Sequence, residues 1–174
     1  LLRIAIYAPL LIPQVSLVLG LQAVLVWLWL DGTWLAMLWI HALFICPFAW
    51  LIIAPAAAAM DRRYIAVAAS LGAGPGRSYL RVVLPMLSPA ITTALFVGVA
   101  VSASLYLPSL FASGGRITTV TLEAVALASG GSRQMAGVAT MLQLAMPLAI
   151  FVLLRVWQAR RYGRFAGMRA GGLQ

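Results

Sequence analysis

The sequence predicts an all-α membrane protein, a polytopic helical bundle with about four transmembrane helices. Of the 174 residues, 64% are hydrophobic and only 9% are charged, whereas about a quarter of the residues of a soluble domain are charged. The first uncharged run, Ile4 to Leu30, is longer than the roughly 20 residues that a helix needs to cross a bilayer. Similar runs recur, so we treat residues 1–174 as one transmembrane domain.

Four spans follow from these runs. Prolines near the start of the first span are tolerated there, and prolines inside later spans are admissible because neighbouring helices satisfy the freed carbonyls. Pro47 and Pro55 are expected to kink the second span, and Pro147 lies inside the fourth. The predicted spans are about Pro9 to Leu30, Trp34 to Ala58, Met86 to Phe111 and Gln134 to Leu154.

The distribution of arginines predicts the orientation. Basic residues are retained on the cytoplasmic side, and an inside N-terminus leaves only Arg116 and Arg133 outside, with the other ten arginines in the cytoplasm. The segment 62–85 and the basic tail 155–174 are then cytoplasmic, as are the residues at both ends of the sequence. Four tryptophans around the Asp31-Gly32 turn fit an aromatic belt at the outer interface; they are Trp27, Trp29, Trp34 and Trp39.

Composition excludes several classes of protein. The net charge of +9 does not indicate nucleic-acid binding, because the arginines fall in short connections and at the tail, where they set topology. The chain contains no lysine, so it lacks the phosphate loop that ATP hydrolysis would require. Cys46 lies in an apolar run and is expected to pack as a small hydrophobe. The start at Leu1, without Met, indicates that further sequence precedes it.

The first cytoplasmic segment has the pattern of a helix, a turn and a second helix. Tyr64, Val67, Ala68 and Leu71 share one helical face. Gly72 is suited to a left-handed cap at the end of this helix.

A second short helix is expected to begin at Pro75 and to carry Arg77 and Arg81 one turn apart. Pro85 marks its passage into the third span. Two interpretations fit such a segment. It is either an amphipathic loop on the membrane surface with arginines on lipid headgroups, or a rigid docking unit for a partner.

At these residues the chain resembles the membrane permease subunits of ATP-binding-cassette importers that work with a substrate-binding protein, the MetI-like permeases with an EAA loop. Their signature is EAA, a glycine three residues on, nine further residues and I-x-L-P. Here Gly72 is followed by nine residues and then by Val82-Val83-Leu84-Pro85. Ala66 stands where the family has glutamate, which leaves open the ionic contact with the ATPase in which that acid is implicated. The resemblance extends over about residues 9–162, and residues 114–131 look like the thiamine-like and iron-like branch.

The resemblance implies a permease subunit of a bacterial inner membrane that forms the translocation pathway. It implies that the chain holds no cofactor and that a separate cytoplasmic ATP-binding subunit hydrolyses ATP. A periplasmic or lipid-anchored substrate-binding protein and a second permease domain are the other implied partners, beside membrane lipids. Such permeases have five or six spans, so this chain would be a C-terminal portion of a longer one. The residues implied in coupling are Ala68, Leu71, Gly72, Arg77, Arg81, Leu84 and Pro85.

Candidates for the translocation path are polar or small residues inside the spans. Gly98, Ser102 and Tyr106 recur every four residues in the third span, so they share a face that either lines the path or packs closely against another helix. His41, in the second span, is either a helix-to-helix hydrogen-bonding residue or a substrate ligand. Weaker candidates in the first span are Gln14, Ser16 and Gln22. The outer segment 113–132 is either a lid, a contact for the binding protein or a simple connector.

Rival functions are weaker but remain open. The spans hold no charged residue at mid-depth, which argues against a proton-driven carrier. An intramembrane hydrolase would need a serine in a strained or glycine-flanked elbow, and the sequence has none that is recognisable. A non-transporting scaffold and a secondary carrier are the alternatives, and co-purification with a phosphate-loop ATPase would separate the importer from both. The transported substrate is not legible, because permeases for thiamine, ferric iron, sulfate-type anions and polyamines are similar.

Overall fold

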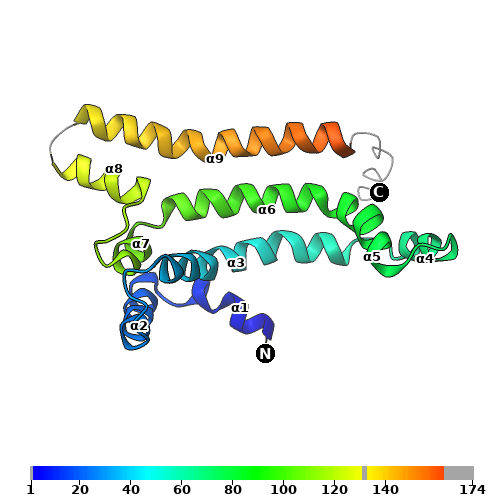
Figure 1. Ribbon diagram of the computed structural model, residues 1–174, viewed down its shortest axis with the longest axis horizontal. Helices are drawn as coiled ribbons and strands as arrows, with labels where there is room; N and C mark the ends of the chain where they lie inside the picture. The colour runs from blue at the N-terminus through cyan, green and yellow to red at the C-terminus, as the bar shows by residue number, and fades with distance from the viewer. Residues whose placement is uncertain (1, 131–132, 163–174) are drawn as a thin grey trace. The chain divides into compact units, whose positions relative to one another are not determined.

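The computed structural model describes residues 2–130 and 133–162, and in these ranges the secondary structure is helical, without strands (Figure 1). Three helical segments of the described chain are long and apolar enough to cross a membrane. They are Trp34–Ala58, Pro75–Ser104 and Gln134–Arg160. The predicted all-α membrane fold is confirmed.

The first predicted span, placed within about residues 9–30, contains the end of one helix and the whole of a second. Helix α1 covers Leu2–Leu11 and α2 covers Gln14–Trp27. Between them Pro13, at φ −52° and ψ 126°, leaves the helical conformation, because it has no N–H with which to continue the α1 ladder. The 14 residues of α2 extend about 21 Å, which is shorter than the roughly 30 Å of bilayer hydrocarbon.

The third predicted span is also interrupted, and its expected continuation to Phe111 is wrong. Helix α6, Leu84–Ser104, ends one residue before Leu105, which has φ −77° and ψ 78°. Helix α7, Tyr106–Ser113, then begins in a new direction. The cause is Pro108, whose ring would meet the carbonyl of Ser104 in a continuous helix. Pro108 is tolerated in the first turn of α7 instead.

The second and fourth predicted spans correspond to single helices. Helix α3 is Trp34–Ala58, the predicted range, with Pro47 inside it. Helix α9 is Arg133–Tyr162 and continues past the predicted end at Leu154. The first part of the predicted basic tail is therefore helical, whereas residues 163–174, with Arg164 and Arg169, lie outside the described residues.

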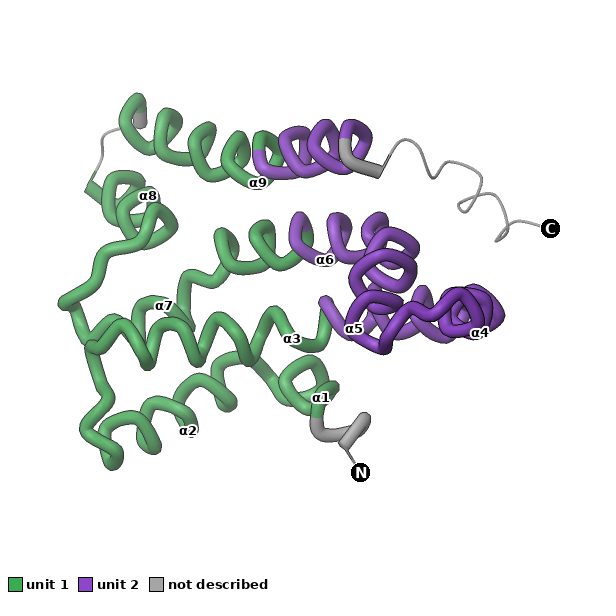
Figure 2. The backbone as a smooth tube through the Cα atoms, turned by 45° about the vertical axis from the view of Figure 1, so that its right-hand side comes forward, with its two compact units in different colours: residues 1–48, 97–149 green, residues 49–96, 150–174 purple. Residues whose placement is uncertain are grey.

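The chain forms two compact units, coloured separately in Figure 2. The first unit contains residues 1–48 and 97–149, and the second contains residues 49–96 and 150–174. In the first unit α2 packs against α7. Its hydrophobic core comprises Val18, Leu25, Ala36, Met37, Ile40, Phe44, Leu105, Ala112 and Ile117.

A polar cluster in the first unit joins three helices at the broken end of α6. The Ala103 carbonyl accepts a hydrogen bond from Thr121 Oγ1 at 2.6 Å and another from Gln143 Nε2. Thr121 belongs to α8, Val120–Ser129, whose first turn is capped by the Thr119 hydroxyl. Because α6 stops just beyond Ala103, side-chain donors from α8 and α9 replace the continuing backbone ladder. The cluster thus attaches α8 to two long helices.

Thr121→Val removes the hydroxyl from this cluster and nearly preserves the volume of the side chain. We expect T121V to lower the free energy of unfolding in mild detergent by about 1 kcal/mol, as for other hydrogen bonds between membrane helices. Ser129→Ala is the matched control, because Ser129 is exposed and its hydroxyl donates within α8, to Val125. Thermal unfolding of the two variants measures the difference. Equal stability of T121V and S129A would show that the cluster does not hold α8.

Candidate functional site

The segment between α3 and α6 folds as two short helices joined by a tight turn. Helix α4 covers Arg63–Ser70. Its start is fixed by the Asp61 carboxylate, which accepts a hydrogen bond from the Arg63 N–H at 2.8 Å. An acidic side chain at this end is favourable because it pairs with an otherwise free backbone donor.

The turn after α4 depends on a left-handed glycine. Gly72 has φ +78°, and its N–H donates to the Ala69 carbonyl while the Ala73 N–H donates to the Ala68 carbonyl, both at 3.0 Å. These two bonds form a Schellman motif, which satisfies the last carbonyls of a helix. No atom lies within 4 Å of the position of an added Gly72 Cβ, so glycine is required here for its conformation. The predicted cap is confirmed.

The second short helix continues into the membrane helix through a π-helical turn. Helix α5, Pro75–Ser78, has proline in its first turn as predicted. It is followed without a break by a π-helix, labelled η1, over Tyr79–Val83, in which the Leu84 N–H donates to the Tyr79 carbonyl five residues back. The prediction that Pro85 marks a passage between two helices is thereby refined, since α5, η1 and α6 are one continuous helical segment.

Pro85 and Pro89 explain the geometry of this segment. In a regular α-helix the ring of Pro85 would clash with the carbonyl of Arg81. Arg81 lies within the wider π turn, Tyr79–Val83, which gives this carbonyl a different position. Pro89 cannot donate to the Pro85 carbonyl, and the Ser88 hydroxyl does so instead at 2.8 Å. Ser88 Oγ in turn accepts a hydrogen bond from the buried Gln158 amide of α9 at 3.1 Å. A side-chain relay from α9 therefore supports the start of α6.

A shallow apolar groove of about 330 Å³ separates α4 from α5 and η1. The hydroxyl of Ser78, which is buried in its floor, lies 3.5 Å from the Ala73 carbonyl and donates to it. The remaining residues that line the groove are Ile65, Ala69, Ala73, Pro75, Tyr79 and Val83. The groove is thus lined by small side chains together with the larger apolar ones of Ile65, Tyr79 and Val83.

The predicted coupling residues all lie in the segment of two short helices and the start of α6 that follows it. Leu71 projects from the turn with 82% of its surface exposed. Ala68 is half-buried, and Arg77 and Arg81 are exposed on α5 and η1. Leu84 and Pro85 form the start of α6, where Pro85 is buried.

Only two of the three residues predicted to share one face of the third span lie on the same helix. Gly98 and Ser102 lie one turn apart on α6, but Tyr106 belongs to α7, so the expectation that all three share one helical face is wrong. The break at Leu105 is the cause. Gly98 is buried, and an added Cβ would lie 3.0 Å from Ile45 Cγ2 of α3, so its small size serves close helix packing.

His41 contacts its own helix through one ring nitrogen and α7 through the other. Its Nδ1 lies 2.8 Å from the Met37 carbonyl, which can only accept, so this nitrogen carries the proton. Its unprotonated Nε2 lies 3.4 Å from the hydroxyl of Ser109, a buried residue of α7 whose single proton is shared between this nitrogen and the Leu105 carbonyl as alternative acceptors. These contacts favour the hydrogen-bonding interpretation of His41 over the ligand interpretation.

Sequence reasoning missed the buried and half-buried polar residues that connect helices. They are Ser88, Ser109, Thr121, Gln143 and Gln158. Their signal was present as isolated hydroxyls and amides within apolar runs, which need partners in a bilayer.

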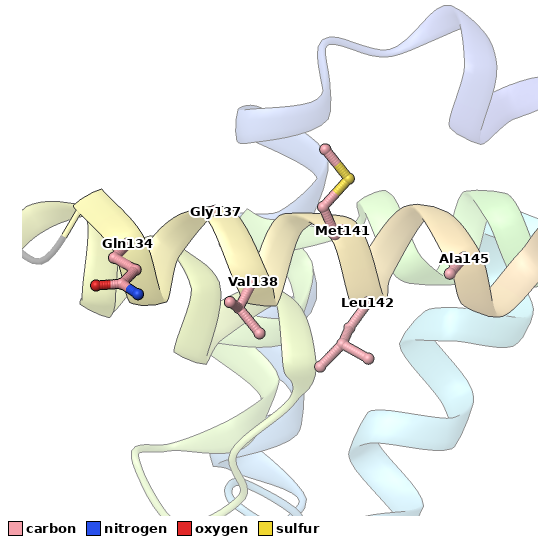
Figure 3. A pocket seen from close by; sticks show the side chains of 6 residues that line it. All are labelled: Gln134, Gly137, Val138, Met141, Leu142 and Ala145. Carbon is pink, nitrogen blue, oxygen red and sulfur yellow. The ribbon is translucent and has the colours of Figure 1, made fainter.

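One face of α9 is open in the described chain. A hollow of about 510 Å³ runs along this single helix (Figure 3). The added Cβ of Gly137 would meet no atom within 4 Å. The lining residues recur at helical spacing and are Gln134, Gly137, Val138, Met141, Leu142 and Ala145.

Comparison with known proteins gives one informative likeness. The inner membrane ABC transporter permease protein YnjC of Escherichia coli (strain K12) is 38% identical to this chain over 148 residues. The aligned region is 85% of this chain and 29% of that relative, so the chain spans less than a third of the relative's length. No family model matches the chain, and no solved structure matches it.

Gly72→Ala tests whether the turn needs a left-handed residue. An L-residue there costs about 1 kcal/mol, so we expect the amide of Ala73, which bonds to Ala68 in this turn, to exchange about fivefold faster with solvent deuterium. The matched control is Gly74→Ala, because Gly74 has φ −65° and open space around its added Cβ. Hydrogen exchange with mass spectrometry follows both variants. Equal exchange in G72A and G74A would contradict the role given to the Schellman turn.

Proposed function

We propose that this chain is part of the transmembrane permease subunit of an ATP-driven importer, and that residues 62–85 couple it to a separate cytoplasmic ATPase subunit. The observation that carries the proposal is the Gly72 turn between two short helices, placed between helices long enough to span a membrane. The likeness to a relative named as an inner membrane ABC transporter permease supports the same function.

The unit suits force transmission because it is joined to long helices at both ends. Helix α4 follows α3 after a short turn, and α5 is continuous with α6 through η1. Displacement of the turn at Gly72 would therefore be passed to two helices at once. ATP-dependent closure of the ATPase subunits would then shift the permease between inward-open and outward-open states.

The proposed function also requires a second permease domain and a substrate-binding protein as partners. The chain itself has no phosphate loop, and ATP would be bound by the partner, so no cofactor is assigned to this chain. The open face of α9 supports packing against a further helix, as a second permease domain would supply. A periplasmic or lipid-anchored substrate-binding protein would deliver the substrate to the outer side, where α8 lies in the proposed topology.

The proposed topology places Ser70 in the cytoplasm and Ser129 outside. Both serines are exposed and end a short helix, with hydroxyls bonded to their own helix, so they form a matched pair. In a Cys46→Ser background, Ser129→Cys in intact spheroplasts should react with an impermeant maleimide and Ser70→Cys should not. Inverted vesicles should reverse the pattern. Labelling of Ser70→Cys from outside would contradict the coupling role.

Gly72→Val tests recruitment of the ATPase. A β-branched residue at positive φ is strained, so we expect about a tenfold loss of ATPase co-purification and of ATP-dependent uptake, with the permease still in the membrane. Gly74→Ala is the control and should retain both. Unchanged recruitment and uptake in G72V, with normal expression, would count decisively against the proposal.

A further inference from the structure

In the second unit, α9 packs against α6 through two contacts that flank Arg155. The Phe151 ring lies against the Phe96 ring of α6, with the ring centroids 4.7 Å apart. The amide of Gln158, which is buried, donates to Ser88 Oγ near the start of α6 at 3.1 Å. Phe151, Arg155 and Gln158 lie at the first, fifth and eighth positions of one helical face. Arg155 is therefore fixed at the seam between two long helices, where it remains exposed.

Arg155 lies at the level where the apolar part of α9 ends. The uncharged run from Gln134 to Leu154 extends about 31 Å as a helix, close to the roughly 30 Å of bilayer hydrocarbon, and Arg155 follows it directly. The guanidinium carbon lies over the Phe151 ring, 5.7 Å from its centroid. A cation in this position is attracted by the face of the ring. The positive charge is thus held against the apolar part of the helix, at the boundary of the hydrocarbon.

The described part of the chain provides no counter-ion for Arg155. The sequence contains three acidic residues, Asp31, Asp61 and Glu123, and only Asp61 belongs to the second unit. The Asp61 carboxylate accepts the Arg63 N–H. Arg155 has the contact with the Phe151 ring but no ion pair or hydrogen bond within the described residues. A charge at the membrane boundary is costly without a partner, so an anion from outside the chain is expected to supply one.

We propose that Arg155 binds the phosphate of an anionic phospholipid in the leaflet that meets the C-terminal part of α9. A guanidinium presents paired N–H donors that match two oxygens of a phosphate. Basic sites between membrane helices on the cytoplasmic side bind acidic lipid headgroups, and this part of α9 is cytoplasmic in the proposed topology. The site would act whether or not residues 62–85 couple to an ATPase.

The surroundings of Arg155 favour a lipid over a soluble anion. Val152 and Leu153, in the turn before Arg155, are 57% and 68% exposed. Val156, directly after it, and Leu95 of α6 are also exposed or half-exposed apolar side chains of the second unit. In a bilayer these side chains are covered by acyl chains. A ligand that reaches the guanidinium along this surface therefore needs a charged headgroup and an apolar part.

The excess of positive charge in the second unit favours a lipid with a net negative charge. A zwitterionic headgroup carries its own ammonium group, which neighbouring arginines repel. Phosphatidylglycerol has a phosphate and no cation, so it is the simplest lipid that fits. The other exposed arginines of this unit within the described residues are Arg62, Arg63, Arg77, Arg81 and Arg160.

The experiment measures lipid binding to the full permease by native mass spectrometry, with phosphatidylglycerol titrated into the protein in a mild detergent. Arg155→Gln should weaken the tightest phosphatidylglycerol site about tenfold. Arg155→Lys should weaken it several-fold, because lysine keeps the charge but lacks the planar pair of donors. Arg160→Gln is the matched control, because Arg160 is exposed on the same helix, and it should change the affinity less than twofold.

A second measurement uses the stabilisation that a bound lipid gives to the folded protein. Phosphatidylglycerol should raise the midpoint of thermal unfolding equally in the wild type and R160Q, and clearly less in R155K, which keeps the charge if R155Q does not fold. Wild-type lipid affinity in R155Q or R155K would overturn the inference. Displacement of the lipid by an excess of inorganic phosphate would overturn it in favour of a soluble anion. Equal binding of phosphatidylglycerol and phosphatidylcholine by the wild type would also overturn it, because the guanidinium would then have another partner.

Discussion

The structure depends on one constraint, which is that a backbone carbonyl in an apolar medium must find a donor when its helical partner is lost. Prolines and helix breaks create such carbonyls in this chain, and at two of them polar side chains supply the donor. The Ser88 hydroxyl donates to the Pro85 carbonyl that Pro89 leaves free, and Gln158 supports Ser88. The Ala103 carbonyl, at the broken end of α6, receives Thr121 and Gln143. In each case a side chain from another helix takes part in the hydrogen bonding at a carbonyl that has lost its helical donor.

Hydrogen bonds to backbone carbonyls also close both sides of η1 in the second unit. The start of α6 is held by a relay from α9, and the end of α4 is closed by its own Schellman bonds. Between these two fixed points lies η1, where the hydrogen bonds have the wider π spacing. The proposed coupling segment is thus presented on a well-defined turn, and the change in helix geometry is confined to the residues that connect it to the membrane helix.

Much of the fold can be predicted from the sequence, because hydropathy and proline position act locally. The bounds of α3, the Gly72 cap and the start of α5 at Pro75 follow from such rules. The breaks at Pro13 and Leu105 do not follow from them, since proline is compatible either with a kink or with a new helix, and tertiary packing decides between the two.

The buried hydrogen-bond relays could not be predicted in the same way. A glutamine such as Gln158 indicates the need for a partner, but the carbonyl it serves through Ser88 is about 70 residues away in the sequence. The π-helix has no signal of its own in the sequence, although Pro85 indicates a change of helix at this point. For the candidate site, the sequence indicates the residues that form the turn, whereas the groove between α4, α5 and η1 requires the structure.

The π-helical turn also has a consequence for the length of the chain at this point. A π turn holds about one residue more than an α turn, and one residue of an α-helix corresponds to a rotation of about 100°. Deletion of a single residue within Tyr79–Val83 would convert the π turn into an α turn and leave α5 and α6 in nearly the same angular relation. The same deletion in a regular α-helical part of the segment would rotate one side against the other by about 100°, so this turn is the place where the chain length can change by one residue without turning α5 about the axis of α6.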